Sequence, residues 1–193
     1  MQKLALHLSN HSIGRISGQI VANNSYSMTC HDERIKLLQD TPFFGAISLE
    51  TIHFILQLAE EQDKPAGHYF FKQGELGDSL YLLEKGCASV FKSCGSEEYE
   101  LRQVNEGCCF GELALIDFTP RSATVRAETD CSALKISSAT LLQLYQHDSE
   151  QFLIIQMNMA REVSRRLRVA DDRWFEIQKN NLHNGRPHDD FIV

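Results

Sequence analysis

The chain has 193 residues, 42% of them hydrophobic, and a formal net charge of −7. This length suits one well-buried domain with additional segments, whereas two full domains would be crowded. The acidic balance gives no general positive field for nucleic acid or an anionic membrane surface, and no uninterrupted apolar run approaches the roughly 20 residues that span a bilayer. The apolar stretch at the amino terminus is too short for a convincing signal peptide, so we expect a cytoplasmic protein.

Six cysteines follow neither a C-x-x-C pattern nor a zinc-ligand spacing. They stand at positions 30, 87, 94, 108, 109 and 131. We expect free thiols in a reducing compartment, mostly small buried side chains that fill a sheet, and no metal or other cofactor.

The first third of the chain predicts an extension followed by two helices. Residues 1–30, rich in Ser, Asn and His, are expected to be flexible. A short helix is expected from Asp32 to Leu38, because the residue before Pro42 is disfavoured in the α region. Ser48 is the expected N-cap of the second helix, whose apolar face is predicted to carry Leu49, Ile52, Leu56 and Ala59.

Between about residues 64 and 136 the apolar residues occur in short runs separated by turn residues. This pattern favours an antiparallel sandwich or barrel over a parallel sheet. The predicted strands are His68–Lys72, Leu80–Glu84, Cys87–Lys92, Glu98–Val104, Ala123–Arg126 and Ala133–Ile136.

A helical period returns after Ile136. Ser138–Tyr145 is a predicted helix, and Ser149 is the expected cap of a longer one that runs to about Gln178. Its apolar stripe could pack on the sheets, pair with a second copy of the chain, or do both in turn. The stripe comprises Phe152, Ile155, Met159, Val163, Leu167, Ala170, Trp174 and Ile177. Residues 179–193 are expected to form a mobile tail.

The stretch FGELALIDFTPRSATV, Phe110–Val125, has the composition of an anion-binding loop. A glycine at 111 lets the backbone approach a ligand, and the short helical turn after it presents free N–H groups to an anion. Arg121 can meet two phosphate oxygens with its planar fork, and Ser122 adds a hydroxyl donor. Glu112 suits a sugar hydroxyl, so a ribose phosphate would satisfy both charges. The alternative is an ordinary surface ion pair between Glu112 and Arg121.

F-G-E-L-A-L followed by P-R-S-A-T-V closely resembles the phosphate-binding cassette of the cyclic nucleotide-binding domain family. The resemblance implies that Glu112 takes the ribose 2′-hydroxyl and Arg121 the cyclic phosphate, with backbone groups of Gly111, Leu113 and Ala114 completing the pocket. A glycine signature before the cassette also resembles that of the family. It comprises Gly67, Gly74, Gly77, Asp78, Tyr81, Gly86 and Val90.

The segment MAREVSRRLRVADD resembles the dimer-forming helix of a bacterial family member. The resemblance implies that Arg166 approaches the ligand and that this chain could form a homodimer through the long helix. Ala170 and Asp171 stand where that relative has hydroxyl residues that touch the adenine. This departure leaves the base preference open, and Asp171 could instead accept from the guanine 2-amino group.

The resemblance covers about residues 32–178 and implies an α+β, mainly β, fold. We expect a domain over 31–178 that contains an antiparallel β-roll or jelly roll (about 64–136) with a short cassette helix. Helices are expected before the roll, and the carboxy-terminal helices over about 138–178.

The function implied is that of a stand-alone cyclic nucleotide-binding sensor and not an enzyme. Cyclic AMP is favoured over cyclic GMP, and ligand binding would reposition the long helix to control an unknown protein partner. No nucleic-acid partner is expected, because a helix-turn-helix module needs tens of residues beyond that helix. A cyclic GMP sensor and a module that has lost its ligand are the alternatives. A cupin-like metal enzyme is disfavoured, because His68 is the only histidine in the predicted strands.

Overall fold

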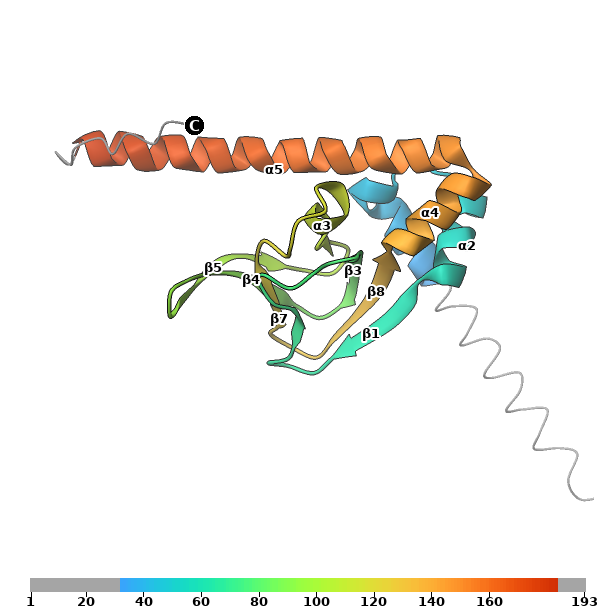
Figure 1. Ribbon diagram of the computed structural model, residues 1–193, viewed down its shortest axis with the longest axis horizontal. Helices are drawn as coiled ribbons and strands as arrows, with labels where there is room; N and C mark the ends of the chain where they lie inside the picture. The colour runs from blue at the N-terminus through green and yellow to red at the C-terminus, as the bar shows by residue number, and fades with distance from the viewer. Residues whose placement is uncertain (1–31, 184–193) are drawn as a thin grey trace, which may run out of the picture.

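The computed structural model describes residues 32–183, and the expected flexible extension over 1–30 lies outside them (Figure 1). Residues 32–40 are helical, followed by the 3₁₀ turn η1 (Pro42–Phe44) and helix α2 (Leu49–Leu58). The Ser48 hydroxyl accepts a hydrogen bond from the backbone N–H of Thr51, which confirms Ser48 as the N-cap of α2.

Two antiparallel four-stranded sheets form the body of the molecule. Their strand orders are β1-β8-β3-β6 and β2-β7-β4-β5, so neither sheet closes into a barrel by itself. The short helix α3 (Leu113–Ile116) lies between β6 and β7 in the chain. The strands are β1 (Glu60–Lys64), β2 (Tyr69–Phe71), β3 (Ser79–Lys85), β4 (Ala88–Cys94), β5 (Glu97–Val104), β6 (Cys109–Phe110), β7 (Thr124–Ala127) and β8 (Cys131–Ser137). The predicted antiparallel β-roll with a short cassette helix is confirmed.

Two of the observed strands were not predicted from the sequence. β1 has the sequence EEQDK, which contains no apolar residue, and it pairs along its whole length with β8. β6 has only two residues, which pair with Tyr81 and Leu82 of β3. The partner strand determines the conformation in both cases, and local periodicity carries no signal for it.

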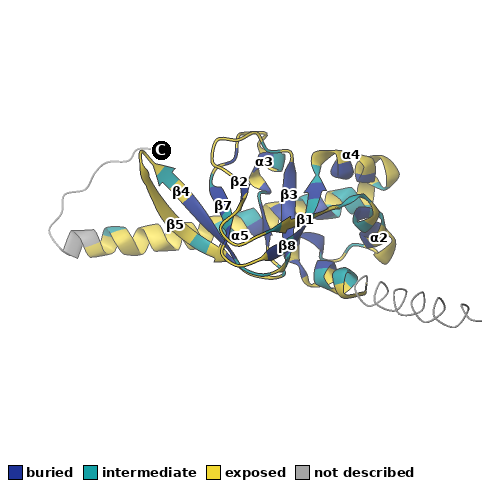
Figure 2. Cartoon of the chain, turned by 90° about the horizontal axis from the view of Figure 1, so that it is seen from below, coloured by how far each residue is buried: buried dark blue, intermediate teal, exposed yellow. Residues whose placement is uncertain are grey.

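Buried side chains form two clusters, one on each side of the first sheet. Figure 2 shows buried residues along β3, β8 and β4, whereas the far part of α5 is exposed. The first joins the helices to that sheet and includes Phe43, Phe44, Ile52, Leu80, Ile136, Leu144, Ile155 and Met159. The second fills the space between the two sheets and includes Phe70, Phe71, Tyr81, Val90, Phe110 and Val125. The rings of Tyr81 and Phe110 stack with centroids 5.3 Å apart. This aromatic cluster lies beneath the predicted cassette.

Helix α4 (Ser138–His147) leads into α5 (Ser149–His183), the longest element of the described chain. The N-cap of α5 is Asp148 and not Ser149, since Asp148 Oδ1 accepts from the backbone N–H groups of Glu150 and Gln151, each at 3.1 Å. The helix also continues five residues past the expected end at Gln178, so residues 179–183 of the expected mobile tail are helical. The first Gly or Pro after Gln178 is Gly185, so nothing in between interrupts a helix.

Only the first half of the α5 stripe is buried. Ile155 and Met159 pack into the first cluster, whereas Leu167, Trp174 and Ile177 are each more than half exposed. The helix passes along the roll, and its carboxy-terminal part extends beyond the sheets (Figure 1). No helix within residues 32–183 has both the length and the apolar character to cross a membrane.

Candidate ligand-binding site

Gly111 joins β6 to α3 in a backbone conformation that favours glycine, with φ of +81°. A Cβ at this position would lie 2.8 Å from Arg121 Nη1 and 3.1 Å from the Phe71 ring. The glycine therefore permits both the turn into α3 and the close approach of the arginine.

Arg121 is buried, with only 5% of its surface exposed. Its guanidinium lies 4.1 Å from the centre of the Phe71 ring, donates from Nη1 to the Gly111 carbonyl oxygen at 2.6 Å and from Nη2 to Ser79 Oγ at 3.3 Å. Its Nε is a buried donor without a partner in the described part of the chain. Burial lowers the pKa of Arg121. Arg121 forms no ion pair within residues 32–183, and nearby carboxylates act on it only at longer range. An anionic ligand would compensate this buried charge directly.

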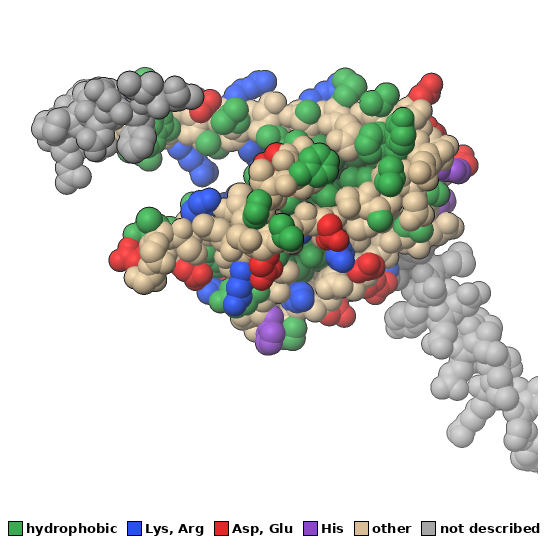
Figure 3. All heavy atoms as spheres, in the orientation of Figure 1, with side chains coloured by type: hydrophobic (Ala, Val, Ile, Leu, Met, Phe, Trp, Pro, Cys, Tyr) green, Lys and Arg blue, Asp and Glu red, His purple; other side chains and the backbone are tan. Residues whose placement is uncertain are grey.

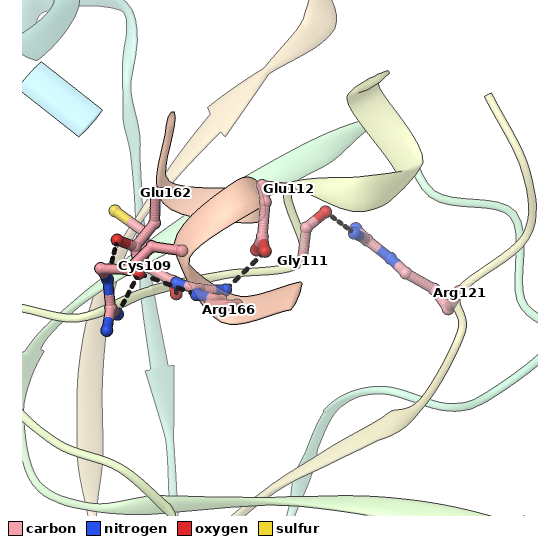
Figure 4. A network of polar contacts seen from close by, with 7 residues as sticks. Cys109, Gly111, Glu112, Arg121, Glu162 and Arg166 are labelled. Carbon is pink, nitrogen blue, oxygen red and sulfur yellow. Dashed lines mark hydrogen bonds and ion pairs between the residues drawn. The ribbon is translucent and has the colours of Figure 1, made fainter. Parts of the chain in front are cut away.

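Glu112 is also buried, but its carboxylate faces α5 and not Arg121 (Figure 4). Glu112 Oε1 accepts from Arg166 Nη1 at 2.5 Å. The surface ion pair between Glu112 and Arg121 is therefore the wrong interpretation. The two side chains lie on opposite sides of Gly111, and only Glu112 depends on a side chain of α5 for its hydrogen bond.

The other cassette residues line the same turn. Ala114 is buried, and the Leu115 N–H donates to the Glu112 carbonyl oxygen at 2.9 Å, which closes the first turn of α3. Leu113 and Ser122 are exposed, and the Ser122 carbonyl oxygen accepts from Lys92 Nζ at 2.6 Å.

Arg166 connects the cassette to α5. Besides Glu112, it donates from Nη2 to the Cys109 carbonyl oxygen at 3.1 Å and from Nε to Glu162 Oε1 at 2.9 Å. Glu162 also accepts two hydrogen bonds from Arg165. The hydrogen bonds from Arg165 and then those from Arg166 lower the pKa of Glu162 from its ordinary 4.5 to about 2.

Glu162 was not predicted from the sequence. Its spacing of three and four residues before Arg165 and Arg166 was the available signal, since such pairs share one face of a helix. The same spacing occurs at many solvated ion pairs, so the sequence could not show that this carboxylate is buried beside the cassette.

A cavity of about 630 Å³ adjoins this network, between α5, η1 and the β4–β5 hairpin. Arg166 and Ala170 line it, together with Leu101, Arg102 and Trp174. Figure 3 shows the recess beside α5 with Lys and Arg side chains on both of its sides. The exposed Asp171 does not line the cavity.

Arg102 is a second residue of this region that was not predicted from the sequence. None of the hydrogen bonds and ion pairs within residues 32–183 involves its guanidinium. Burial lowers the pKa of Arg102, and the positive charge of Arg166 lowers it further. The cavity wall therefore carries a partly buried donor without an acceptor.

The thiols follow the expectation only in part. Cys109 and Cys131 are buried in the sheet, and burial raises the pKa of Cys109. Cys94 and Cys108 are exposed, and Cys108 lines the cavity. Cys30 lies outside the described residues. From residue 32 to 183, no group of three His, Cys, Asp or Glu side chains could hold a metal ion.

Residues 61–148 match the family model of the cyclic nucleotide-binding domain. The chain is 43% identical over 91 residues to a cAMP-dependent protein kinase regulatory subunit of Emericella nidulans, an alignment that covers 47% of this chain and 19% of the relative. It is 30% identical over 139 residues to the cyclic AMP receptor protein of Thermus thermophilus, covering 69% of this chain and 61% of the relative. The chain thus spans less than two thirds of either relative.

Solved structures show the same architecture. The catabolite activator protein of Thermus thermophilus superposes with a TM-score of 0.64 at 29% identity, covering 72% of this chain and 63% of that one. A cyclic nucleotide-binding domain from Methylobacillus flagellatus superposes with a TM-score of 0.71 over 85% of this chain and 88% of that one. Its 21% identity shows a shared fold only.

Proposed function

We propose that this chain is a cyclic nucleotide sensor with cyclic AMP as the first candidate ligand, since residues 61–148 match the family model of the cyclic nucleotide-binding domain. The observation that carries the proposal is the buried guanidinium of Arg121, which within residues 32–183 has one donor without a partner and no ion pair with a carboxylate. Such a group is costly to bury without an anion. Both relatives described above are named for cyclic AMP.

In this proposal the cyclic phosphate meets Arg121 and takes the place of the Gly111 carbonyl as acceptor. Glu112 accepts from the ribose 2′-hydroxyl through the oxygen that Arg166 does not use. The base extends into the cavity beside Ala170 and Trp174. Each part of the ligand then meets a group of matching chemistry.

The output of the sensor is proposed to be a change in the packing of α5. Arg166 of α5 forms an ion pair with Glu112. In the proposal, a ligand that contacts Glu112 binds more tightly to one packing of α5 than to another, and this difference in affinity shifts the population between them. The exposed apolar residues Leu167, Trp174 and Ile177 provide the surface for a protein partner or a second copy of the chain.

Cyclic GMP is the second candidate, and Arg102 is the observation that favours it. Guanine presents two acceptors, O6 and N7, on one edge, whereas adenine presents a donor beside N7. An arginine on the cavity wall that has no hydrogen-bond partner among the described residues suits the guanine edge better.

Parallel calorimetric titrations with cyclic AMP, cyclic GMP and non-cyclic AMP test the function. The proposal expects saturable binding of a cyclic nucleotide, with non-cyclic AMP much weaker. Tighter binding of cyclic GMP, lost in Arg102→Ala, would replace the first candidate by the second. The absence of binding by all three would leave a domain that has lost its ligand.

A further inference from the structure

Glu162 is a buried carboxylate on α5 to which neither the cassette nor the proposed ligand contacts assign a role. Only 9% of its side chain is exposed. Both of its oxygens accept hydrogen bonds, Oε1 from Arg166 Nε at 2.9 Å and Arg165 Nη2 at 2.7 Å, and Oε2 from Arg165 Nε at 2.8 Å. Burying a carboxylate is unfavourable unless cations compensate it, so this pairing is the condition for its position.

The Arg166 guanidinium is held by three acceptors, one for each nitrogen. Glu162 lies on the same helix, whereas the Cys109 carbonyl and the Glu112 carboxylate lie on either side of Gly111. Figure 4 shows the guanidinium between the two carboxylates. Two buried carboxylates therefore share one cation, which spans the junction between α5 and the cassette.

We propose that Glu162 is a positioning residue, which holds Arg166 against Glu112 and so fixes the carboxylate that receives the sugar hydroxyl of the ligand. This inference rests on the proposed function. A free arginine side chain has several rotatable bonds, and fixing it costs conformational entropy. Glu162 fixes it before the ligand arrives, so less ordering is left for the binding step.

Electrostatic repulsion among arginines is a second reason for the contact between Glu162 and Arg166. Arg102 and Arg165 carry positive charges near Arg166, and the charge of Arg102 opposes that of Arg166. Glu162 supplies the negative charge on the α5 side that offsets this repulsion. Without this negative charge, repulsion from the neighbouring arginines would favour movement of the Arg166 side chain away from the cassette. Glu112 Oε1 would then lose its hydrogen-bond donor.

The test compares a cyclic nucleotide with its 2′-deoxy form, using whichever of cyclic AMP and cyclic GMP binds more tightly. In the parent protein, loss of a hydrogen bond to a charged group should weaken binding by roughly tenfold or more. In Glu162→Gln, this ratio of dissociation constants should fall by about threefold or more, because Glu112 is no longer fixed. The matched control is Glu176→Gln, which removes an exposed i,i+3 ion pair with Lys179 on the same helix, and it should leave the ratio unchanged.

A role of Glu162 in helix stability alone would weaken both ligands by the same factor, and an unchanged ratio would overturn the proposal. A cycle without ligand separates this outcome from failure of the proposed function. Urea unfolding midpoints are measured for Glu112→Gln, Glu162→Gln and the double variant. Sharing of Arg166 predicts that the two shifts do not add. Additive shifts would overturn the inference even if a cyclic nucleotide binds. If the parent protein binds no cyclic nucleotide, the proposed function is wrong, and the unfolding cycle alone then decides whether Glu162 and Glu112 are coupled through Arg166.

Discussion

Arg121 donates a hydrogen bond to the carbonyl oxygen of Gly111 at 2.6 Å, across the turn that begins α3. The arginine thus lies inside the site, with its Nε lacking a partner in the described chain. A ligand phosphate can therefore exchange a neutral acceptor for a charged one without moving the guanidinium far. A phosphate adds a negative charge on the acceptor side and can accept two parallel hydrogen bonds from the planar guanidinium, which a single carbonyl oxygen cannot do.

Arg121→Ala should accordingly weaken cyclic nucleotide binding by ~2–5 kcal/mol, or roughly 30-fold to several thousand-fold. Arg121→Lys should recover only part of the loss, because an ammonium cannot meet two phosphate oxygens with a planar fork. Isothermal titration calorimetry measures both, with circular dichroism as the control for folding. A folded Arg121→Ala protein with the affinity of the parent would exclude this residue as the main phosphate contact.

Gly77→Ala should displace Arg121 without a substitution in the cassette itself. An alanine Cβ at position 77 would lie 2.5 Å from Arg121 Nε and 2.6 Å from its Cζ, closer than atoms can approach. We expect a loss of roughly tenfold or more in affinity, equivalent to ~1.4 kcal/mol.

The matched control for this variant is Gly45→Ala, whose added Cβ has its nearest neighbour at 3.7 Å, an ordinary contact. Thermal unfolding of both variants separates a local effect on the site from a loss of fold. Equal affinities of the Gly77→Ala protein and the parent would show that Arg121 does not need its observed position to bind.

The sequence predicted the cassette well because its geometry is local. Gly111, Glu112 and Arg121 lie within one turn and loop, so their residue types and spacing carry most of the required geometry. Both Glu112 and Arg121 are buried in the structure. The partner of Glu112 is not local, because Arg166 follows 54 residues later in the chain, on another element. Only the resemblance to a family placed it near the ligand.

Residues on the cavity wall could not be predicted for the same physical reason. In the sequence, Arg102 resembles any charged residue on the exposed face of a strand, and only the position of α5 makes it part of a cavity wall. Glu162 likewise resembles a member of an ordinary solvent-exposed ion pair on a helix. Strand β1 was missed because its polar sequence takes its conformation from β8. Tertiary contacts decide all three, and a single sequence records none of them directly.

Acid should destabilise the protein through Glu162. Because the pKa of Glu162 in the folded protein is about 2 and its ordinary value is 4.5, the folded state holds the ionised form more strongly than the unfolded chain does. The stability from this carboxylate is fully present above about pH 4.5 and is lost as the pH falls towards about 2. Urea unfolding of the parent across this window should show a falling free energy of unfolding.

Glu162→Gln should show a shallower decline over the same pH window, since the amide does not titrate. Glu176→Gln, on the exposed part of the helix, provides the control. Identical pH profiles for the parent and Glu162→Gln would mean that other carboxylates account for the acid sensitivity.

Trp174 should report on the ligand. It is the only tryptophan of the chain, it lines the cavity, and 52% of its surface is exposed, so it is not a fixed core residue in this structure. A base that enters the cavity, or an α5 that packs more closely on the roll, would remove water from the indole ring. Its emission should then move to shorter wavelength in a saturable way during a cyclic nucleotide titration. The same titration of Arg121→Ala, at equal concentrations, should leave the emission unchanged. If calorimetry shows binding while the tryptophan signal stays constant, α5 neither moves nor contacts the base, and the proposed coupling between the cassette and this helix is wrong.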